Sequence, residues 1–281
     1  MPTTEEARWW FAEEIRAVAH LQSDALVAAC ARVPREAFLG PGPWQIARAF
    51  DHAVPYRVTA DADPRHLYHD VLVAIDPARQ LHNGQPNALA RWIEAADIRP
   101  GDRVLHVGCG TGYYTAILAE LAGPTGRVTA FEVDPALAAR ARTALATWPT
   151  VRVETGDAAA PDGPFDAIFI NAGCTHPRSE WLAALVPGGR LVIPLTFHSP
   201  ALPHGVGGML RAERRDPRWP AQIVSQVGIY DCCNARDPQN EAELRKLATL
   251  GASPKLGSVL VEPHERGDAC LAHLPGFCLQ K

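Results

Sequence analysis

A glycine-rich turn is the strongest chemical signal in the sequence. The apolar segment 104–107 leads into Gly108, Gly110 and Gly112, and a helix is predicted directly after them. Glycine adopts backbone angles that other residues avoid, and it lets a ligand approach the main chain closely. The GxGxG spacing differs from the GxGxxG of dinucleotide-binding turns. The turn therefore indicates a small-molecule site, with a purely structural tight turn as the alternative.

Acidic residues follow the next two predicted strands. Glu132 ends a strand over 128–132, where a carboxylate can accept hydrogen bonds from both hydroxyls of a ribose. Asp157 follows a strand over 151–154, where a carboxylate can reach an adenine amino group. In doubly wound sheets such strand ends share the ligand-binding rim. Capping of the next helix is the alternative role for Glu132, although Asp134 is better placed for it.

Short strands and helices alternate around these residues for about 95 residues. The predicted strands cover 104–107, 128–132, 151–154, 165–171 and 189–195, and the predicted helices cover 113–122, 135–147 and 179–185. This alternation is typical of a parallel sheet with helices on both faces, an α/β fold.

The flanking segments differ from this core. We predict an N-terminal cover of helices and loops over 1–98 that is not an independent domain, because prolines and glycines break up residues 33–66. The ligand-binding core covers 99–196. Residues 197–281 contribute further strands and a helix, including strands near 257–262 and 269–274, and complete the sheet and the substrate side.

Composition excludes several classes of protein. Of the 281 residues 47% are hydrophobic, so the chain can bury a large core and is not disordered. The net charge is −4 with no basic stripe, so we expect no nucleic-acid partner. No run of about 18 apolar residues and no signal peptide is visible, so we expect a cytoplasmic protein without membrane contact.

The cysteine and histidine patterns predict no metal site. Seven cysteines form an odd set without a CxxC pair, and eleven histidines form no HExxH or HxH cluster. We interpret the cysteines as reduced thiols that mostly fill small apolar spaces.

The core resembles class I S-adenosylmethionine-dependent methyltransferases over about residues 99–196. The resemblance rests on the glycine turn, Glu132, Asp157 and the PGG segment in Leu185–Ile193. It implies a Rossmann-like seven-stranded sheet with one antiparallel strand near the edge, and S-adenosyl-L-methionine as cofactor. The residues that it places at the cofactor are His106, Gly108, Cys109, Gly110, Thr111, Gly112, Glu132, Val133, Asp157 and Ala158. The family usually has Glu or Asp where this chain has His106.

Three further segments resemble the protein-L-isoaspartate O-methyltransferases. They are Val33–Phe38 (VPREAF), Arg99–Leu105 and Phe165–Ile168, and the resemblance then spans about residues 20–200. It implies O-methylation of a carboxylate, either isoaspartyl or aspartyl, in a peptide or protein.

The segment Gln80–Pro86 aligns with the substrate loop of that family. Gly84 stands where the family has a serine beside the substrate carboxylate, so His82, Asn83 and Gln85 are the candidate catalytic groups. A structural loop is the alternative for His82 and Asn83. A carboxylate is already ionised at neutral pH, so the enzyme mainly aligns the reactants and excludes water.

Other acceptors and other classes of protein stay open. An alcohol, phenol or nitrogen acceptor would favour a base, for which His69, Asp70 and His82 are candidates. The alternatives are a methyltransferase that acts on a small molecule or a biosynthetic peptide, and a cofactor-binding module without turnover. The GxGxG spacing and the PGG strand argue against a nicotinamide oxidoreductase. We expect a monomer or a homodimer.

Overall fold

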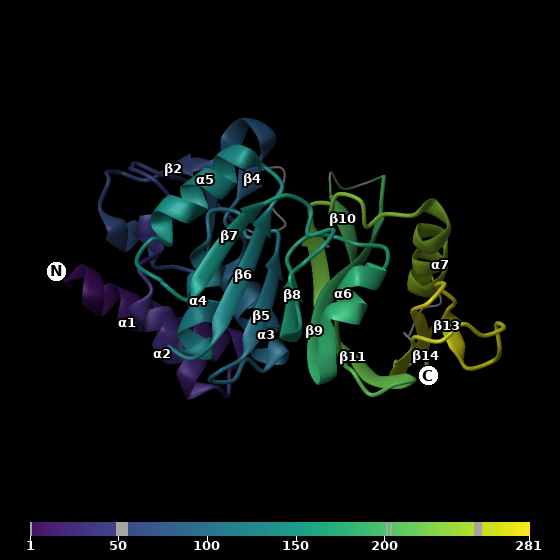
Figure 1. The fold of residues 1–281 in the computed structure, drawn as a ribbon. Coiled ribbons are helices and arrows are strands. Elements are labelled where there is room, and N and C mark those ends of the chain that lie inside the picture. Colours follow the sequence, from purple (N-terminus) through teal and green to yellow (C-terminus); the bar gives the residue numbers. More distant parts are fainter. Residues whose placement is uncertain (1, 49–55, 201, 203, 250–254) are drawn as a thin grey trace.

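The computed structural model describes residues 2–48, 56–200, 202, 204–249 and 255–281. The chain runs from helices at one end of the molecule, through a large twisted sheet, to short strands at the other end (Figure 1). The N- and C-terminal ends therefore lie at opposite ends of the molecule.

A mixed sheet positions the glycine turn. Its strand order is β13-β14-β12-β11-β10-β9-β8-β5-β6-β7, and its parallel part has β5 at its centre. The parallel strands are β5 (Arg103–Val107), β6 (Arg127–Glu132), β7 (Val151–Thr155), β8 (Phe165–Ile170) and β9 (Leu185–His198). All five end at one rim, so the predicted α/β fold with a parallel core is confirmed.

Helices cover both faces of this sheet. They are α3 (Pro86–Ala96), α4 (Tyr113–Ala122), α5 (Pro135–Ala144), α6 (Ser179–Ala184) and α7 (Pro238–Thr249). Asp134 caps α5 by accepting hydrogen bonds from the N–H groups of Ala136 and Leu137, as predicted. Strand β5 is buried from Val104 to Val107, because a sheet covered on both faces needs apolar residues throughout.

The C-terminal part of the sheet is larger than predicted. Strand β10 (Gly205–Glu213) is antiparallel to both β9 and β11 (Arg218–Ile229), as the resemblance implied. Three short antiparallel strands then extend the sheet beyond β11, namely β12 (Ser258–Leu260), β14 (Cys278–Gln280) and β13 (Cys270–Ala272). The sheet has ten strands in the part of the chain that the structure describes, rather than seven. Two of these added strands, β12 and β13, lie within the strands predicted near 257–262 and 269–274, whereas the three residues of β14 are too few for a clear periodicity.

The N-terminal segment packs against the core. Helices α1 (Thr4–Ala19) and α2 (Asp24–Arg32) share one apolar cluster with α3 and α4, in which Phe11, Leu26 and Ile117 are buried. The remaining strands form a small antiparallel sheet, with β1 (Gln45–Ala47), β2 (Arg57–Val58), β3 (Leu72–Asp76) and β4 (Leu81–His82). The shared cluster is the physical basis for our proposal that residues 1–98 are not an independent domain.

A buried guanidinium holds this cover together. Arg35 is fully buried, and its side chain donates hydrogen bonds to the carbonyl oxygens of Leu67, His69 and Val71 at 2.7, 3.1 and 2.8 Å. Three main-chain oxygens thus replace water at the two terminal nitrogens of the guanidinium, while its Nε has no partner among the described residues. The bonds fix the path of the chain over residues 67–71.

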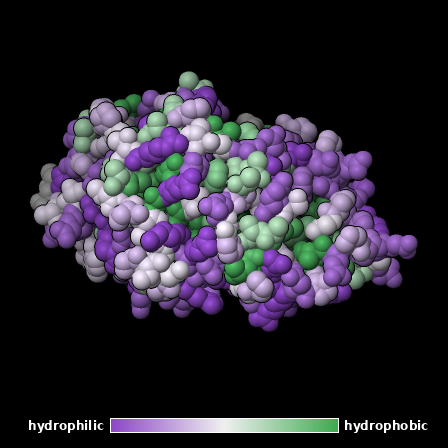
Figure 2. Space-filling model, viewed as in Figure 1, coloured by the Kyte–Doolittle hydropathy of each residue, from purple (hydrophilic) through white to green (hydrophobic). Residues whose placement is uncertain are grey.

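The molecular surface is mostly hydrophilic on the face that Figure 2 shows, with apolar residues in small groups. Within the described residues, no helix combines the length and the apolar character that a membrane span requires.

We predict that Arg35→Met destabilises the protein by about 3–5 kcal/mol, because three buried carbonyl oxygens lose their donors. Chemical denaturation measures the change. The matched control is Arg32→Met, whose half-exposed side chain pairs with Glu120 and whose loss should cost less than about 1 kcal/mol. Equal midpoints for the two variants would contradict the role of Arg35.

Candidate active site

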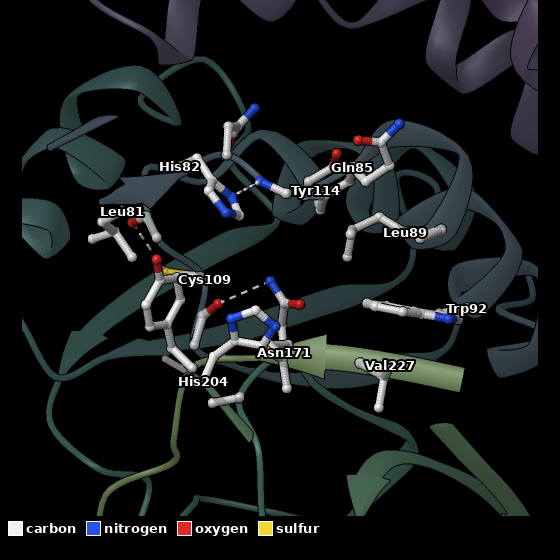
Figure 3. Close-up of a pocket in the computed structure, with 18 of the residues that line it drawn as sticks. Leu81, His82, Gln85, Leu89, Trp92, Cys109, Tyr114, Asn171, His204 and Val227 are labelled. Carbon is white, nitrogen blue, oxygen red and sulfur yellow. Dashed lines mark hydrogen bonds between the residues drawn. The ribbon is translucent and has the colours of Figure 1, made fainter. Parts of the chain in front are cut away.

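A cavity of about 630 Å³ lies at the carboxyl ends of β5, β6 and β7. One side is formed by the glycine turn and by the ends of β6 and β7. The other side is formed by the loop 81–85, by α3 and by the end of β11. Figure 3 shows this second side, with Leu89 and Trp92 from α3 facing Val227 from β11. The cavity volume falls within the range of small-molecule sites, roughly 300–1,000 Å³.

The glycine turn bends the chain toward this cavity. Gly108, Gly110 and Gly112 have φ angles of +78°, +56° and +96°, which L-residues with a side chain rarely adopt. A Cβ on Gly112 would lie 2.6 Å from Leu145 Cδ1, so this glycine allows α4 to pack against the end of α5. A Cβ on Gly110 would meet nothing within 4 Å. Gly110 therefore presents bare backbone to an open space.

Glu132 holds the turn from the neighbouring strand. Its carboxylate accepts hydrogen bonds from the N–H of Gly110 at 2.7 Å and from the N–H of Asp134 at 3.1 Å. The side chain lines the cavity, and the residue is only 8% exposed. A single charge thus orients the turn and faces the ligand space.

Asp157 is braced by two later segments of the chain. Its carboxylate accepts hydrogen bonds from Asn234 Nδ2 at 2.7 Å and from an Arg178 guanidinium nitrogen at 3.2 Å. These partners, Asn234 first, hold the pKa of Asp157 below its usual value. The rim therefore carries a fixed negative charge.

The loop with the predicted catalytic residues is tied to the cover. Gln85 Nε2 donates to the Asp70 carbonyl oxygen at 2.9 Å, and the Asp70 carboxylate accepts the Asn87 N–H at 2.9 Å. The Asn83 N–H donates to the Val73 carbonyl oxygen at 2.8 Å. Asp70, a candidate base, is thus used to hold the start of α3.

Comparison with known proteins decides the family. The family model for protein-L-isoaspartate(D-aspartate) O-methyltransferase matches residues 11–201. The chain belongs to this family. It is 36% identical over 201 residues to a protein-L-isoaspartate O-methyltransferase of Methylorubrum populi, with 70% of this chain and 80% of the relative covered. A second enzyme of that name, from Ignicoccus hospitalis, is 36% identical over 148 residues, with 50% of this chain and 69% of the relative covered.

Solved structures show the same fold. A protein-L-isoaspartate O-methyltransferase structure matches with a TM-score of 0.65 at 21% identity, covering 86% of this chain and 70% of the other. A Plasmodium falciparum structure, described as a complex with S-adenosyl-L-homocysteine, matches with a TM-score of 0.55 at 15% identity. The match covers 80% of this chain and 95% of the other. This family member is an S-adenosylmethionine-dependent methyltransferase.

The predicted cofactor residues of this methyltransferase divide into two groups. Those that line the cavity are Gly108, Cys109, Gly110, Glu132, Val133 and Asp157. Those outside the cavity lining are His106, Thr111, Gly112 and Ala158. The second group supports the turn and the strand ends from behind, because these residues are buried or, like Gly112, packed against Leu145.

His106 differs most from its predicted place. It is fully buried in β5, where its Nδ1 lies 2.9 Å from Thr115 Oγ1 and its ring packs beside Phe169. Burial lowers the pKa of His106 to about 3, so the imidazole is neutral. The described structure therefore places this residue in the packing between β5 and α4, outside the cavity lining.

Several methyltransferase residues at the cavity were missed from the sequence. Asn171 follows β8 and donates to the Gly108 carbonyl oxygen at 3.4 Å, while His204 precedes β10 (Figure 3). Tyr230 lies between two histidine rings, 5.9 Å from His82 and 6.4 Å from His204 between ring centroids. Asn171 ends a predicted strand at the ligand rim, so its position was a usable signal. Tyr230 and His204 come from the C-terminal part, where no motif points to the site.

Two tyrosines close the loop over the cavity. Tyr230 donates its hydroxyl to the Gln80 carbonyl oxygen at 2.6 Å, and Tyr56 donates to the same oxygen at 3.3 Å. Gln80 has a φ of +54°, and its carbonyl oxygen lies between the hydroxyls of Tyr56 and Tyr230. The loop 80–85 is therefore attached to the cover and to the end of the large sheet.

We predict that Gly84→Ala costs about 2–4 kcal/mol of stability. Gly84 has a φ of +75°, and a Cβ there would lie 3.0 Å from Leu89 Cδ2, so backbone strain and overpacking add. Gly40→Ala is the matched control, since its φ is +71° and its Cβ would meet nothing within 4 Å. The control should lose only about 1–2 kcal/mol of stability, which is the cost of backbone strain without overpacking. Thermal denaturation with equal losses for both variants would exclude the Leu89 contact as a constraint on this loop.

Proposed function

We propose that this methyltransferase transfers a methyl group to the carboxylate of an isoaspartyl or aspartyl residue in a peptide or protein. The observation that carries the proposal is Asn83, which lines the cavity and whose Nδ2 is buried without a hydrogen-bond partner among the described residues. An amide donor of this kind suits a negatively charged acceptor oxygen. The names of the relatives point to the same class of acceptor.

The glycine-turn end of the cavity suits the cofactor. Gly110 leaves room for close backbone approach, because a Cβ there would meet nothing within 4 Å. The Glu132 carboxylate retains acceptor capacity for ribose hydroxyls beyond its two N–H bonds. Asp157 provides a second acceptor at the rim, suited to an adenine amino group. S-adenosylmethionine supplies a methyl group on a sulfonium, which is already activated for transfer.

The loop end of the cavity suits the acceptor. Asn83 and the Tyr114 hydroxyl are neutral donors, and burial raises the pKa of Tyr114, so its proton stays in place. His82 lies across the cavity from Asn171 and His204 in Figure 3. Gln85 acts by bracing the loop through Asp70. The main tasks of these residues are to orient an ionised carboxylate and to exclude water, because such an acceptor has no proton to lose.

The cavity continues along α3, which suits a peptide acceptor. Arg91 lines it and forms no ion pair with the residues that the structure describes. Ala19 from α1 and Gln226 from β11 line the same stretch. A flexible chain can therefore extend past the reacting group while a cation faces its acidic side chains.

We predict that Glu132→Gln weakens S-adenosylmethionine binding by about 10- to 100-fold, which is 1.4–2.7 kcal/mol. The amide keeps the size of the side chain but loses the charge, and its NH2 group replaces one of the two oxygens that accept main-chain N–H groups. Isothermal titration calorimetry measures the affinity, with Glu154→Gln on the neighbouring strand β7 as the control outside the cavity lining. Unchanged affinity in Glu132→Gln would show that this carboxylate serves the turn and not the ribose.

Mass spectrometry tests the reaction itself. The protein is incubated with S-adenosylmethionine and three peptides of one sequence, with isoaspartate, aspartate or asparagine at one position. We expect one added methyl group on an acidic peptide and none on the asparagine peptide. Cofactor binding without methylation of either acidic peptide would overturn the proposed acceptor.

We predict that Asn83→Ala lowers kcat/KM for the methylated peptide by about 10- to 100-fold and leaves cofactor affinity within about twofold, because the amide acts on the acceptor. Gln222→Ala is the matched control, since Gln222 is an exposed amide on β11 outside the cavity lining. A parallel loss of cofactor affinity in Asn83→Ala would show that the loop only covers the cofactor.

A further inference from the structure

Four side chains with metal-binding atoms converge at the C-terminal end of the molecule. They are His264, Cys270, His273 and Cys278, and their ligand atoms all lie within 4.8 Å of one another. Cys270 begins β13 and Cys278 begins β14, while His264 and His273 lie in the loops beside them. The small strands β13 and β14 therefore bring together residues that are spread over 15 positions of the sequence.

The spacing of these atoms is close to that of a tetrahedral metal site. Zinc bonds of about 2.3 Å to sulfur and 2.0–2.1 Å to nitrogen place tetrahedral ligand atoms about 3.3–3.8 Å apart. His264 Nε2 already lies 3.4 Å from Cys270 Sγ. The longest separation of 4.8 Å requires a shift of only about 1 Å, which loop residues can provide.

Hydrogen bonds from outside the cluster orient its members. His264 Nδ1 lies 3.0 Å from the Glu262 carbonyl oxygen, which can only accept, so Nδ1 carries the proton. In the neutral ring, Nε2 then presents its lone pair toward Cys270. The Gly267 N–H donates to Cys270 Sγ at 3.4 Å. Both contacts are of the kind that support the ligands of metal sites.

A buried nitrogen supplies an independent observation. His273 Nδ1 is buried and has no hydrogen-bond partner within the described parts of the chain. The His273 ring also lies edge-to-face against the His264 ring, with 4.8 Å between centroids. A buried polar atom of this kind is costly unless something binds it.

We propose that His264, Cys270, His273 and Cys278 form a structural zinc site. Two thiolates and two imidazoles are a ligand set that favours Zn²⁺. Four protein ligands leave no open position for a substrate, and none of the four lines the active-site cavity. Our sequence analysis predicts no metal site, because the H-x5-C-x2-H-x4-C spacing of this set matches none of the patterns sought there.

The site would stabilise the last strands of the sheet. Between the ligands stand Leu271, Leu274 and Phe277, which are buried, and Phe277 packs edge-to-face against Trp219 of β11. Strands of three residues bury little area alone, whereas a metal ion ties β13, β14 and the loop before them together. Metal binding and the packing of β13 and β14 against the rest of the sheet therefore occur together.

Metal analysis of the untagged, purified full-length protein tests the proposal. We expect about one zinc per chain by plasma mass spectrometry, with an affinity below about 100 nM in a chelator competition. Cys270→Ser and His273→Asn should each reduce the zinc content to below about a tenth of the wild-type value. The matched controls Cys233→Ser and His20→Asn change residues outside the cluster and should retain the metal.

Experiments on the wild-type protein keep the test decisive if the variants do not fold. Cobalt that replaces the zinc should give the thiolate charge-transfer absorption of a two-thiolate tetrahedral site, and chelation should lower Tm by at least about 5 °C. A zinc-free protein that binds no added zinc, a Cys270–Cys278 disulfide in the protein as isolated, or zinc that persists in the ligand variants would each overturn the proposal. None of these outcomes depends on which acceptor is methylated.

Discussion

The burial of the Arg35 guanidinium is the constraint on which the position of the loop 80–85 depends. A guanidinium cannot lose its charge, so it is buried only where acceptors surround it. Here the acceptors are three carbonyl oxygens from residues 67–71. Asp70 lies in the middle of that segment and contacts Gln85 and Asn87 through its carbonyl and carboxylate oxygens. The VPREAF segment therefore positions the loop 80–85 without touching the cavity, and the cover and the loop must fold together.

The glycine turn shows the same kind of constraint with the opposite charge, since a buried charge there is again held by main-chain groups. Glu132 is a nearly buried carboxylate that accepts main-chain N–H groups from its own strand end and from the glycine turn. Arg35 behind the loop 80–85 and Glu132 at the glycine turn are thus each stabilised by backbone dipoles rather than by an ion pair. Such partners cannot change rotamer, which makes both walls more rigid than ion pairs between long side chains would.

The sequence predicted the parts of the protein that depend on local backbone geometry. Glycines with positive φ, the strand ends at Glu132 and Asp157, and the Asp134 cap lie where their patterns indicated. Of the last three strands, β12 and β13 were predicted and β14 was not, and the residues that face the loop were harder to predict. Tyr230 reaches Gln80 across 150 positions, and such a contact depends on how β11 crosses the molecule. His106 is a different case, because the resemblance places it at the cofactor whereas the structure has it buried in β5, outside the cavity lining.

The two tyrosine bonds to the Gln80 carbonyl have a consequence for local motion. Both hydroxyls can exchange this partner for water, so releasing this one attachment costs only about 1–3 kcal/mol. Global unfolding typically costs several times more. This attachment can thus break many times while the sheet stays intact, with a small fraction of molecules released at any moment. The bonds of Asn83 and Gln85 to the cover remain in place meanwhile, so such motion is confined to the Gln80 end of the loop.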